Sequence, residues 1–593
     1  MNIRVLFLAL MATLFAVSCT EKEDTTEPVK LVAQPAELSF DATGGTQDLV
    51  LTSGIKPTVS CSDNWITLAE GSYASNTLSV KVTAKENTGT TERSGSIRVI
   101  GEKQSLMIAV KQGFPQVKLS VDKTSASFDR FGGMAEITVT SSQQPTVTSD
   151  ASWCGASVGT IDGQHQTKVS ILAGANRTQE ARKATITVSC GTEKVTVSVS
   201  GEAGQTPAVA STTALTPQMV FETIGPGWNM GNHMDAISNG IAAETVWGND
   251  KCTQATFDRV KAAGFQAVRI CTTWEGHIGE APAYLIEEKW IGRVEEIVGY
   301  AEKAGLVAIV NTHHDESYWQ DISKCYNNPT QNEKVKEEIF TFWTQVANRF
   351  KDKGEWLIFE SFNEIQDGGW GWSAAFQADP QKQYDVLNGW NQVFVDAVRA
   401  TGGNNATRWL GVPGYAASPT FTIPGLVVPK DYTSANRLMV AVHDYDPYNY
   451  TLNDPLVRRF GHTAERSLRC AEDDEAGLRW TFDQLKQTYI DKGIPVYLGE
   501  MGCSRHADAD YPFQKYYMEY FCKAAADRGL PMFLWDNGAS GIGAEKHGYI
   551  NHGTGAFLDA KAEELVGIMI KAITTKDPAY TLESVYDAAP KED

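Results

Sequence analysis

The sequence predicts a multidomain protein in which two all-β sandwiches are followed by an α/β domain, a (β/α)8 barrel. The chain has 593 residues, which is more than a single hydrophobic core usually supports. Residues 31–203 are rich in Thr, Ser and Val, alternate polar with apolar side chains, and contain an internal repeat. From about residue 215, short apolar runs alternate with longer amphipathic stretches, which is typical of parallel strands covered by helices.

We expect residues 1–19 to be a targeting segment that lies outside the fold. Arg4 precedes one apolar run, which is too short to cross a bilayer as a permanent helix. The run ends at Ser18-Cys19 and resembles the signal of a bacterial lipoprotein, which implies that Cys19 is lipidated. The acidic tether that follows, residues 20–30, resembles the start of surface lipoproteins from the Bacteroides group. These features predict a protein that is lipid-anchored at the outer membrane, on the cell surface.

Residues 31–114 and 115–203 are expected to form two similar sandwiches. Landmarks recur at a nearly constant offset, so that Trp65 in the first repeat corresponds to Trp153 in the second. Each repeat reads Ser-Phe, then Gly-Gly, then Pro, then this Trp. The pattern resembles BACON modules, which are immunoglobulin-like domains found beside carbohydrate-active enzymes. Two roles stay open: the tryptophans bind glycan, or they fill the cores of modules that act as spacers. Their shared register favours the spacer role.

The second half of the chain begins after a linker. Residues 204–214 are small, polar and aperiodic, whereas residues 215–593 alternate strand and helix patterns. Several predicted helices end in Gly just before a strand, as at Ala263-Gly264. A doubly wound open sheet is the alternative to a barrel, but no Gly-rich phosphate loop follows a predicted strand. The eight predicted strands are 225–231, 266–271, 306–312, 355–362, 408–413, 438–443, 495–499 and 532–535.

Polar and aromatic residues stand at the carboxyl ends of these predicted strands, where a (β/α)8 barrel carries its chemistry. Glu364 follows the fourth strand and Glu500 follows the seventh. A lone acid at a strand end is most simply a solvated loop residue, but two such acids suggest a paired-acid catalyst. The other candidates at strand ends are Arg269, Trp274, His313, His314, Asn363, His443, Tyr445 and Trp535.

Composition narrows the class of ligand. The formal charge of −20 argues against nucleic acid as the main partner and is compatible with a neutral carbohydrate. The 15 Trp include natural platforms for sugar rings, and two carboxylates suit glycoside hydrolysis. His313 and His314 could suggest a metal with His443, but adjacent residues on a strand point to opposite sides. Since the cysteines also lack C-x-x-C spacing, we expect no metal and no cofactor.

In their order and spacing, the strand-end motifs resemble glycoside hydrolase family 5, over about residues 215–578. The segment 244–249 further resembles the branch that holds many endo-β-1,4-glucanases and xyloglucanases. Two departures from the family pattern concern loop geometry: Ile365 stands where Pro is frequent, and Cys271-Thr272 stands where Pro-Val is frequent. The motifs that carry the resemblance are 227–232, 267–270 with Trp274, 311–315, 362–364, 443–445, 498–502 and 534–535.

The resemblance implies a retaining double displacement, with Glu364 as proton donor and general acid/base and Glu500 as nucleophile. Glu364 must then have a raised pKa, through desolvation and the like charge of Glu500. For His314, packing beneath the barrel rim and contact with sugar are equally open. The implied supporting roles are nucleophile contacts for Arg269 and Tyr445, a 2-hydroxyl contact for Asn363, site histidines at His313 and His443, and a sugar platform at Trp535.

These observations predict an endo-acting hydrolase of β-1,4-glucan backbones, whether cellulose-like, mixed-linkage or xyloglucan. An endo-β-1,4-mannanase is the alternative within enzymes, since the same barrel and glutamates serve both. A catalytically silent, glycan-binding surface lipoprotein is the alternative outside enzymes. The expected partners are the β-glucan substrate and, through the lipid anchor, a membrane; we expect a monomer that binds no nucleic acid.

Overall fold

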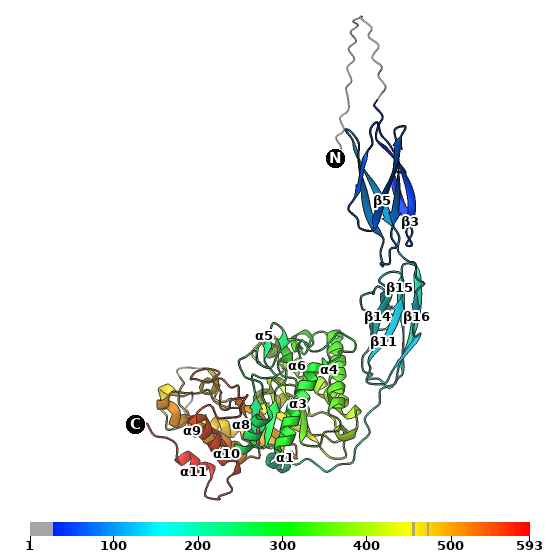
Figure 1. Ribbon diagram of the computed structural model, residues 1–593. Helices are drawn as coiled ribbons and strands as arrows, with labels where there is room; N and C mark the ends of the chain where they lie inside the picture. Colours follow the sequence, from blue (N-terminus) through cyan, green and yellow to red (C-terminus); the bar gives the residue numbers. More distant parts are fainter. Residues whose placement is uncertain (1–27, 454–456, 471–473, 593) are drawn as a thin grey trace, which may run out of the picture.

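The computed structural model describes residues 28–453, 457–470 and 474–592. The predicted signal segment, the lipidation site Cys19 and most of the acidic tether therefore lie outside the described residues. The two sandwiches extend one after the other from one side of the barrel, with the first sandwich farthest from it (Figure 1). None of the helices in the described ranges combines the length and apolar content needed to cross a membrane.

Each sandwich consists of two four-stranded sheets. The sheet orders are β1-β3-β6-β5 and β2-β8-β7-β4 in the first, and β10-β16-β15-β12 and β13-β14-β11-β9 in the second. Strands such as β6 and β14 alternate buried and exposed side chains, as expected when one face of a sheet covers a core. The strands are β1 (Val32–Gln34), β2 (Glu37–Phe40), β3 (Gly45–Thr52), β4 (Thr58–Cys61), β5 (Ile66–Ala74), β6 (Thr77–Ala84), β7 (Arg93–Ile100), β8 (Ser105–Gln112), β9 (Ser120–Val121), β10 (Ser125–Phe128), β11 (Gly133–Thr140), β12 (Thr146–Ser149), β13 (Cys154–Val158), β14 (Gln166–Ala173), β15 (Arg182–Cys190) and β16 (Glu193–Gly201).

The repeated sequence landmarks have the same structural cause in both sandwiches. Gly44 has φ +77°, and a Cβ there would lie 2.3 Å from the carbonyl oxygen of Ala84. Gly132 repeats this close approach with φ +73°. In each module the repeated tryptophan ring is covered by an arginine: Arg93 lies 4.5 Å from the centre of Trp65, and the corresponding pair of the second sandwich has the same distance. The covered ring face offers no open platform to a sugar.

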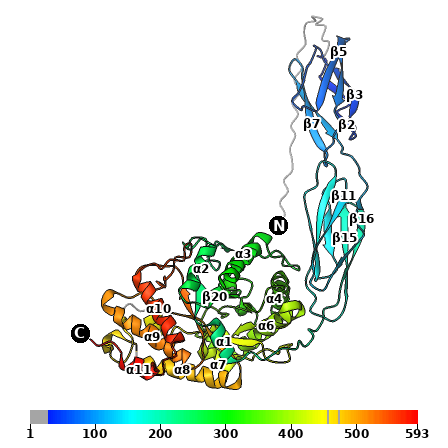
Figure 2. The same cartoon turned by 60° about the horizontal axis from the view of Figure 1, so that its bottom comes forward.

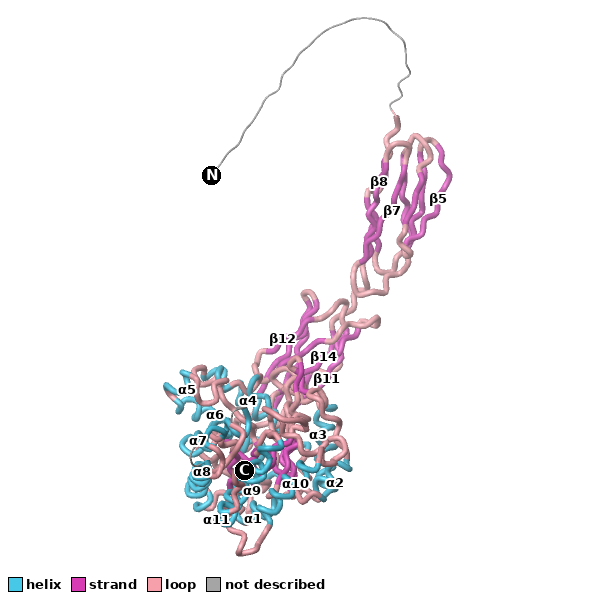
Figure 3. Tube along the Cα trace, turned by 90° about the vertical axis from the view of Figure 1, so that its left-hand side faces the viewer, coloured by secondary structure: helices cyan, strands magenta, loops and turns pink. Residues whose placement is uncertain are grey.

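The second half of the chain forms a closed barrel of eight parallel strands, which confirms the predicted fold class. The strand order β17-β20-β21-β22-β23-β24-β25-β26 follows the sequence, and helices surround the strands (Figures 2 and 3). The strands are β17 (Gly227–Met230), β20 (Ala267–Ile270), β21 (Val307–Val310), β22 (Leu357–Glu360), β23 (Leu410–Pro413), β24 (Leu438–His443), β25 (Val496–Met501) and β26 (Met532–Asp536). A short hairpin, β18 (Ile237–Ser238) and β19 (Ile241–Ala242), follows β17.

Amphipathic helices bury their apolar faces against the barrel. The long helices α4 and α6 pack side by side, as do α9 and α10. The helices are α1 (Pro217–Ile224), α2 (Gln254–Ala262), α3 (Glu288–Ala304), α4 (Pro329–Arg349), α5 (Ala374–Ala378), α6 (Pro380–Ala400), α7 (Pro419–Gly425), α8 (Asp474–Thr488), α9 (Tyr511–Ala526), α10 (Ala560–Thr574) and α11 (Leu582–Asp587).

Helix α1, which the sequence analysis did not predict, belongs to the core inside the barrel. Its buried residues Val220 and Ile224 share one apolar cluster with inward-facing strand residues such as Ile309 and Ile358. Thr216 caps the helix by accepting a hydrogen bond from the N–H of Met219. Because α1 precedes β17, it lies at the amino-terminal ends of the strands, and the carboxyl ends are left for a site.

The predicted linker is bound to the barrel rather than free. The N–H of Ala210 donates to the carbonyl oxygen of Tyr432 at 2.8 Å, and the N–H of Ser434 donates back to Ala210 at 2.8 Å. The second sandwich also touches α4, because the N–H of Ala175 donates to the Thr341 hydroxyl at 3.3 Å. A cavity of about 440 Å³ lies between this sandwich and the barrel.

Candidate active site

The two predicted acids meet at the carboxyl ends of the barrel strands. Glu364 follows β22 by a few residues and Glu500 lies near the end of β25. His443, at the end of β24, stands between them: its Nδ1 is 2.6 Å from Glu364 Oε1 and 3.7 Å from Glu500 Oε2. The three contacting atoms all lie within 4.8 Å of one another. The two carboxylates are therefore close enough to act on the same bond.

Glu500 is held by two hydrogen-bond donors. Arg269 Nη1 donates to Oε1 at 2.8 Å, and the Tyr445 hydroxyl donates to Oε2 at 2.9 Å. Burial raises the pKa of Glu500, while the positive charge of Arg269 and the hydrogen bond from Tyr445 oppose the rise. The predicted contacts of Arg269 and Tyr445 with this carboxylate are both present. They fix the carboxylate in one orientation, as an attacking group requires.

Glu364 is placed so that it keeps a proton near neutral pH. Burial, followed by the negative charge of Glu316, raises the pKa of Glu364 to about 7, while His314 and Arg269 lower it. Its side chain is still 19% exposed, so that it can reach a ligand. Burial lowers the pKa of His443 to about 4, so the imidazole beside Glu364 is neutral at pH 7. Sequence reasoning expected burial and Glu500 as the causes and missed Glu316, which lies in the short helical turn after β21.

Two local backbone features lie beside the site: an irregularity in strand pairing, and glycines that leave room for site side chains. The register of β24 against β25 shifts between Val442 and His443, so the regular pairing of the strands is interrupted where His443 stands. A Cβ on Gly499 would lie 3.0 Å from His443 Nε2, and one on Gly231 would lie 2.6 Å from the indole of Trp535. Glycine at these two places thus leaves room for a histidine and a tryptophan of the site.

His313 and His314 have different surroundings. His313 is buried, and its Nδ1 lies 3.2 Å from the amide nitrogen of Asn311. Its ring is parallel to that of Trp535, with centres 5.9 Å apart. His314 is one-third exposed and lies beside Asp235 and the ring of Trp247. His314 is therefore accessible to a ligand at the cleft. In His313, Asn311 occupies Nδ1, so Nε2 is the ring nitrogen left for other contacts.

The predicted contribution of Trp274 to substrate binding is corrected by the structure. Its ring is fully buried, and its indole N–H donates to the backbone oxygen of Asn311 at 3.0 Å. It packs edge-on against Phe342 of α4, with ring centres 5.0 Å apart. Trp274 therefore supports the strand end from behind and does not face the cleft. Its position just after β20 gave no indication of the direction of its ring.

Among the residues that the structure describes, two further clusters of His, Cys, Asp and Glu have spacings that could suit a cation, but their donor chemistry does not. The first cluster comprises Asp235, His313 and His314. The side-chain NH2 group of Asn311 donates to Glu360 and faces Nδ1 of His313, so this Nδ1 is an acceptor. The proton of His313 therefore lies on Nε2, the atom that faces Asp235. A protonated ring nitrogen cannot ligate a metal.

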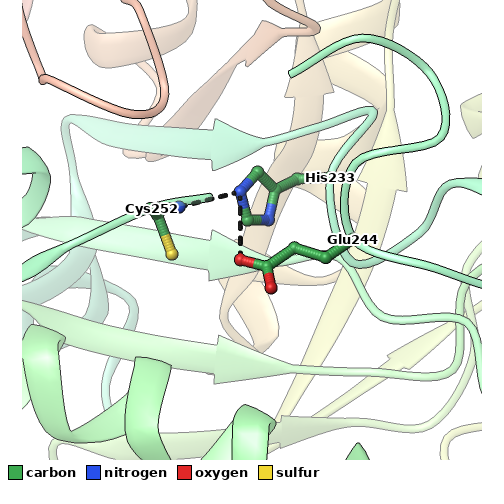
Figure 4. Close-up of side chains that lie close together, drawn as sticks. All are labelled: His233, Glu244 and Cys252. Atoms are coloured by element: carbon green, nitrogen blue, oxygen red, sulfur yellow. Dashed lines mark hydrogen bonds and ion pairs between the residues drawn. The ribbon is translucent and has the colours of Figure 1, made fainter. Parts of the chain in front are cut away.

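The second cluster comprises His233, Glu244 and Cys252 (Figure 4). Arg293 occupies both oxygens of Glu244, at 2.5 and 3.0 Å, and therefore neutralises this carboxylate. Burial raises the pKa of Cys252 to about 12, so it is a thiol. His233 Nε2 faces the backbone N–H of Cys252 at 3.2 Å. These contacts fasten the segment 244–249 to the barrel.

Comparison with known proteins places this geometry in context. The family model described as "Cellulase (glycosyl hydrolase family 5)" matches residues 231–541, and the BACON model matches residues 56–113 and 139–200. Endoglucanase B of Clostridium cellulovorans is 37% identical over 335 residues, which cover 56% of this chain and 70% of that protein. Endoglucanase A of Paenibacillus barcinonensis is 33% identical and covers 58% of this chain and 86% of that protein.

Solved structures give similar results. A GH5-4 broad specificity endoglucanase from Bacteroides salanitronis has 50% sequence identity and a TM-score of 0.59, over 62% of this chain and 97% of that chain. A Bacteroides ovatus GH5 xyloglucanase, in complex with a XXXG heptasaccharide, has 27% identity and a TM-score of 0.55. That match covers 77% of this chain and all of that chain, 100%.

Proposed function

The chain belongs to glycosyl hydrolase family 5 and is an endo-β-1,4-glucan hydrolase, and from this premise we propose that Glu364 and Glu500 cleave the backbone by a retaining double displacement. The observation that supports the mechanism most is the distance between the two acids, whose nearest oxygens lie within 4.8 Å. Retaining pairs are about 5–5.5 Å apart, whereas inverting pairs are about 6.5–9.5 Å apart to admit a water.

In the first step, Glu500 attacks the anomeric carbon while Glu364 gives its proton to the glycosidic oxygen. The bond between the anomeric carbon and that oxygen breaks, and a covalent glycosyl ester forms on Glu500. Arg269 and Tyr445 hold the attacking carboxylate, and a pKa of about 7 keeps Glu364 protonated up to near neutral pH. The fragment of the polysaccharide that carries the former glycosidic oxygen leaves, and the proton from Glu364 stays on that oxygen as part of a hydroxyl group.

In the second step, Glu364, now ionised, takes a proton from a water molecule, and the water oxygen attacks the anomeric carbon. The ester to Glu500 breaks and the carboxylate returns to Arg269 and Tyr445. Two inversions at one carbon give net retention. Glu364 thus acts first as acid and then as base, which its change of charge during the first step allows.

Neighbouring side chains would bind the sugar at the cleavage point. Asn363 accepts a hydrogen bond from Arg269 Nη2 through its Oδ1 at 2.6 Å, so its NH2 group is left for a sugar hydroxyl. Trp535, beside His313, supplies an aromatic face. Exposed aromatic side chains lie on two loops that follow barrel strands, namely Trp247 after β17 and Trp370 and Trp372 after β22.

We further propose a broad β-1,4-glucan specificity that includes xyloglucan. The neighbours of known structure support this, because one is a broad specificity endoglucanase and another is a xyloglucanase. The purified enzyme should release oligosaccharides of intermediate length from xyloglucan, carboxymethylcellulose and mixed-linkage glucan, and much less from mannan. Product chromatography at early times tests this. Rapid cleavage of mannan with little action on the glucans would instead favour a mannanase, and no new reducing ends on any polymer would favour a silent binding protein.

We also propose that Cys19 carries a lipid that anchors a monomeric enzyme at the outer membrane, on the cell surface, with the two sandwiches as spacers. The proposal rests on the sequence before residue 28, the extended arrangement of the sandwiches and the arginine-covered Trp65. Expression with an alkyne fatty acid should label the native chain but not a Cys19→Ala variant. Equal labelling of both chains would contradict the assignment.

A further inference from the structure

One buried carboxylate beneath the active site is not used by the reaction steps above. Glu360 is the last residue of β22, is fully buried, and lies four positions before the proton donor Glu364. An ionised group in such a place is costly unless it is fully bonded. Charge and hydrogen bonds from Arg269 outweigh the effect of burial, so the pKa of Glu360 is lowered and it is ionised. Its partners show what this charge does.

Glu360 holds the guanidinium of Arg269 from one side. Arg269 Nε donates to both oxygens at 3.0 and 3.2 Å, and Nη2 donates to Oε1 at 2.6 Å. With that edge occupied, Nη1 is left to donate to Glu500 and the second hydrogen of Nη2 to Asn363. The orientation of the nucleophile and that of the sugar-binding amide therefore both depend on how Glu360 seats Arg269.

Glu360 also sets the orientation of His313, through Asn311. The side-chain NH2 group of Asn311 donates to Glu360 Oε1 at 3.0 Å, and its side-chain oxygen Oδ1 accepts from the backbone N–H of Thr272 at 3.1 Å. The amide is thus fixed, and its nitrogen lies 3.2 Å from His313 Nδ1. His313 must then carry its proton on Nε2, where it lies 4.0 Å from Glu500 Oε1.

The charge of Arg269 is shared between two carboxylates. Glu360 and Glu500 both face the guanidinium, so neither receives all of its charge. A nucleophile that held the whole cation would be a weaker attacking group, because its lone pairs would be more stabilised in the ground state. The remaining contact of Glu360 is the Tyr497 hydroxyl, which donates to Oε2 at 2.5 Å from the barrel interior.

We propose that Glu360 is a positioning residue for this reaction: it fixes Arg269 and Asn311 and divides the charge of Arg269 between itself and the nucleophile. The proposal rests on the proposed roles of Glu364 and Glu500 and adds a residue that touches neither sugar nor reacting atoms. It also separates two functions of the same carboxylate. The carboxylate geometry orients the site, and its charge sets the electrostatic balance there.

The decisive variant is Glu360→Gln, which keeps the shape and removes the charge. We expect kcat/KM on carboxymethylcellulose to fall by roughly 10²-fold, because displaced groups near the reacting atoms cost about that much. We also expect the alkaline limb of the pH profile to move to lower pH, since the negative charge of Glu360 raises the pKa of Glu364. The other charged and titratable groups that face Glu364 keep their residue types in this variant: Glu316, His314, Arg269, His443, Glu500, Tyr445 and Glu545.

Two matched variants isolate the charge. Tyr497→Phe removes one hydrogen bond to Glu360 and leaves its charge, and Glu360→Asp keeps the charge but shortens the side chain. Both should lower the rate and leave the alkaline limb in place. A purely structural role would lower the rate of Glu360→Gln with an unmoved limb, and that result would overturn the proposal. If Glu360→Gln does not fold, a Glu360→Asp enzyme with unchanged kcat/KM would overturn it, and one slowed with the limb in place would support it.

The failure of this inference can be told apart from failure of the catalytic assignment. Glu364→Gln, measured beside these variants, tests the assignment alone. If Glu364→Gln is inactive while Glu360→Gln behaves as the native enzyme, only the role of Glu360 is wrong.

Discussion

Replacement of Glu500 by alanine is expected to lower kcat on soluble β-glucan by roughly 10⁴-fold or more, because the covalent route is lost when its nucleophile is removed. Arg269 and Tyr445, which hold this carboxylate, are hydrogen-bond donors directed at it and would not take over its attack. Binding should change little, so KM is expected to stay within a few-fold of the native value. Steady-state kinetics on carboxymethylcellulose and xyloglucan measure both parameters.

Azide provides the sharper readout for the same variant. The small anion can occupy the space left by the carboxylate and attack an activated aryl β-cellobioside from the same side, so the product should be the α-glycosyl azide. Asp508→Ala is a suitable control, because Asp508 is 90% exposed and lies outside the site. A β-configured azide from the Glu500 variant, or residual activity near the control level, would contradict the nucleophile assignment.

Replacement of Glu364 by glutamine is expected to lower kcat/KM on polysaccharide by about 10²–10⁴-fold, the usual contribution of a general acid. Aryl β-cellobiosides with very good leaving groups need no proton, so they should lose far less in the first step. The pH profile gives an independent test. Glu364 must be protonated in the free enzyme and its pKa is about 7, so native kcat/KM should fall as the pH rises through 7.

In the glutamine variant that alkaline limb should disappear, since the titrating group is gone. Azide should then yield the β-glycosyl azide by attack on the glycosyl ester, which distinguishes this variant from the Glu500 variant. An alkaline limb that persists near pH 7 in Glu364→Gln would mean that another group donates the proton. His443 would then be the first to examine, since it lies 2.6 Å from Glu364.

Much of the fold could be predicted from the sequence because its signals are local. Each barrel strand is a short apolar run bounded by polar or Gly residues, and all eight predicted strands overlap an observed one. Helix α1 was missed although Thr216 and Pro217 form a recognisable helix start. Its burial depends on the floor of a barrel that exists only after the eight strands close, and the chain near it carries no such information.

The site was predictable where a residue type marks its own role. Acids after apolar strands identified Glu364 and Glu500, since no local reason requires them there. Glu360 was overlooked because it is a single acid at the end of an apolar strand. Its role in the site depends on its contact with Arg269, which lies on another strand. Glu316 acts on Glu364 through space alone. Trp274 misled for the converse reason: a strand-end position does not determine the direction of a side chain.

The most direct test is to trap the covalent intermediate. A 2-deoxy-2-fluoro-β-cellobioside with a dinitrophenolate leaving group should inactivate the enzyme, because the fluorine slows hydrolysis of the ester more than its formation. Digestion and tandem mass spectrometry should then find one fluorocellobiosyl group on Glu500, and the Glu500→Ala variant should take up none. A label on Glu364 or on any other residue would contradict the assignment, as would turnover of the reagent to the inverted sugar.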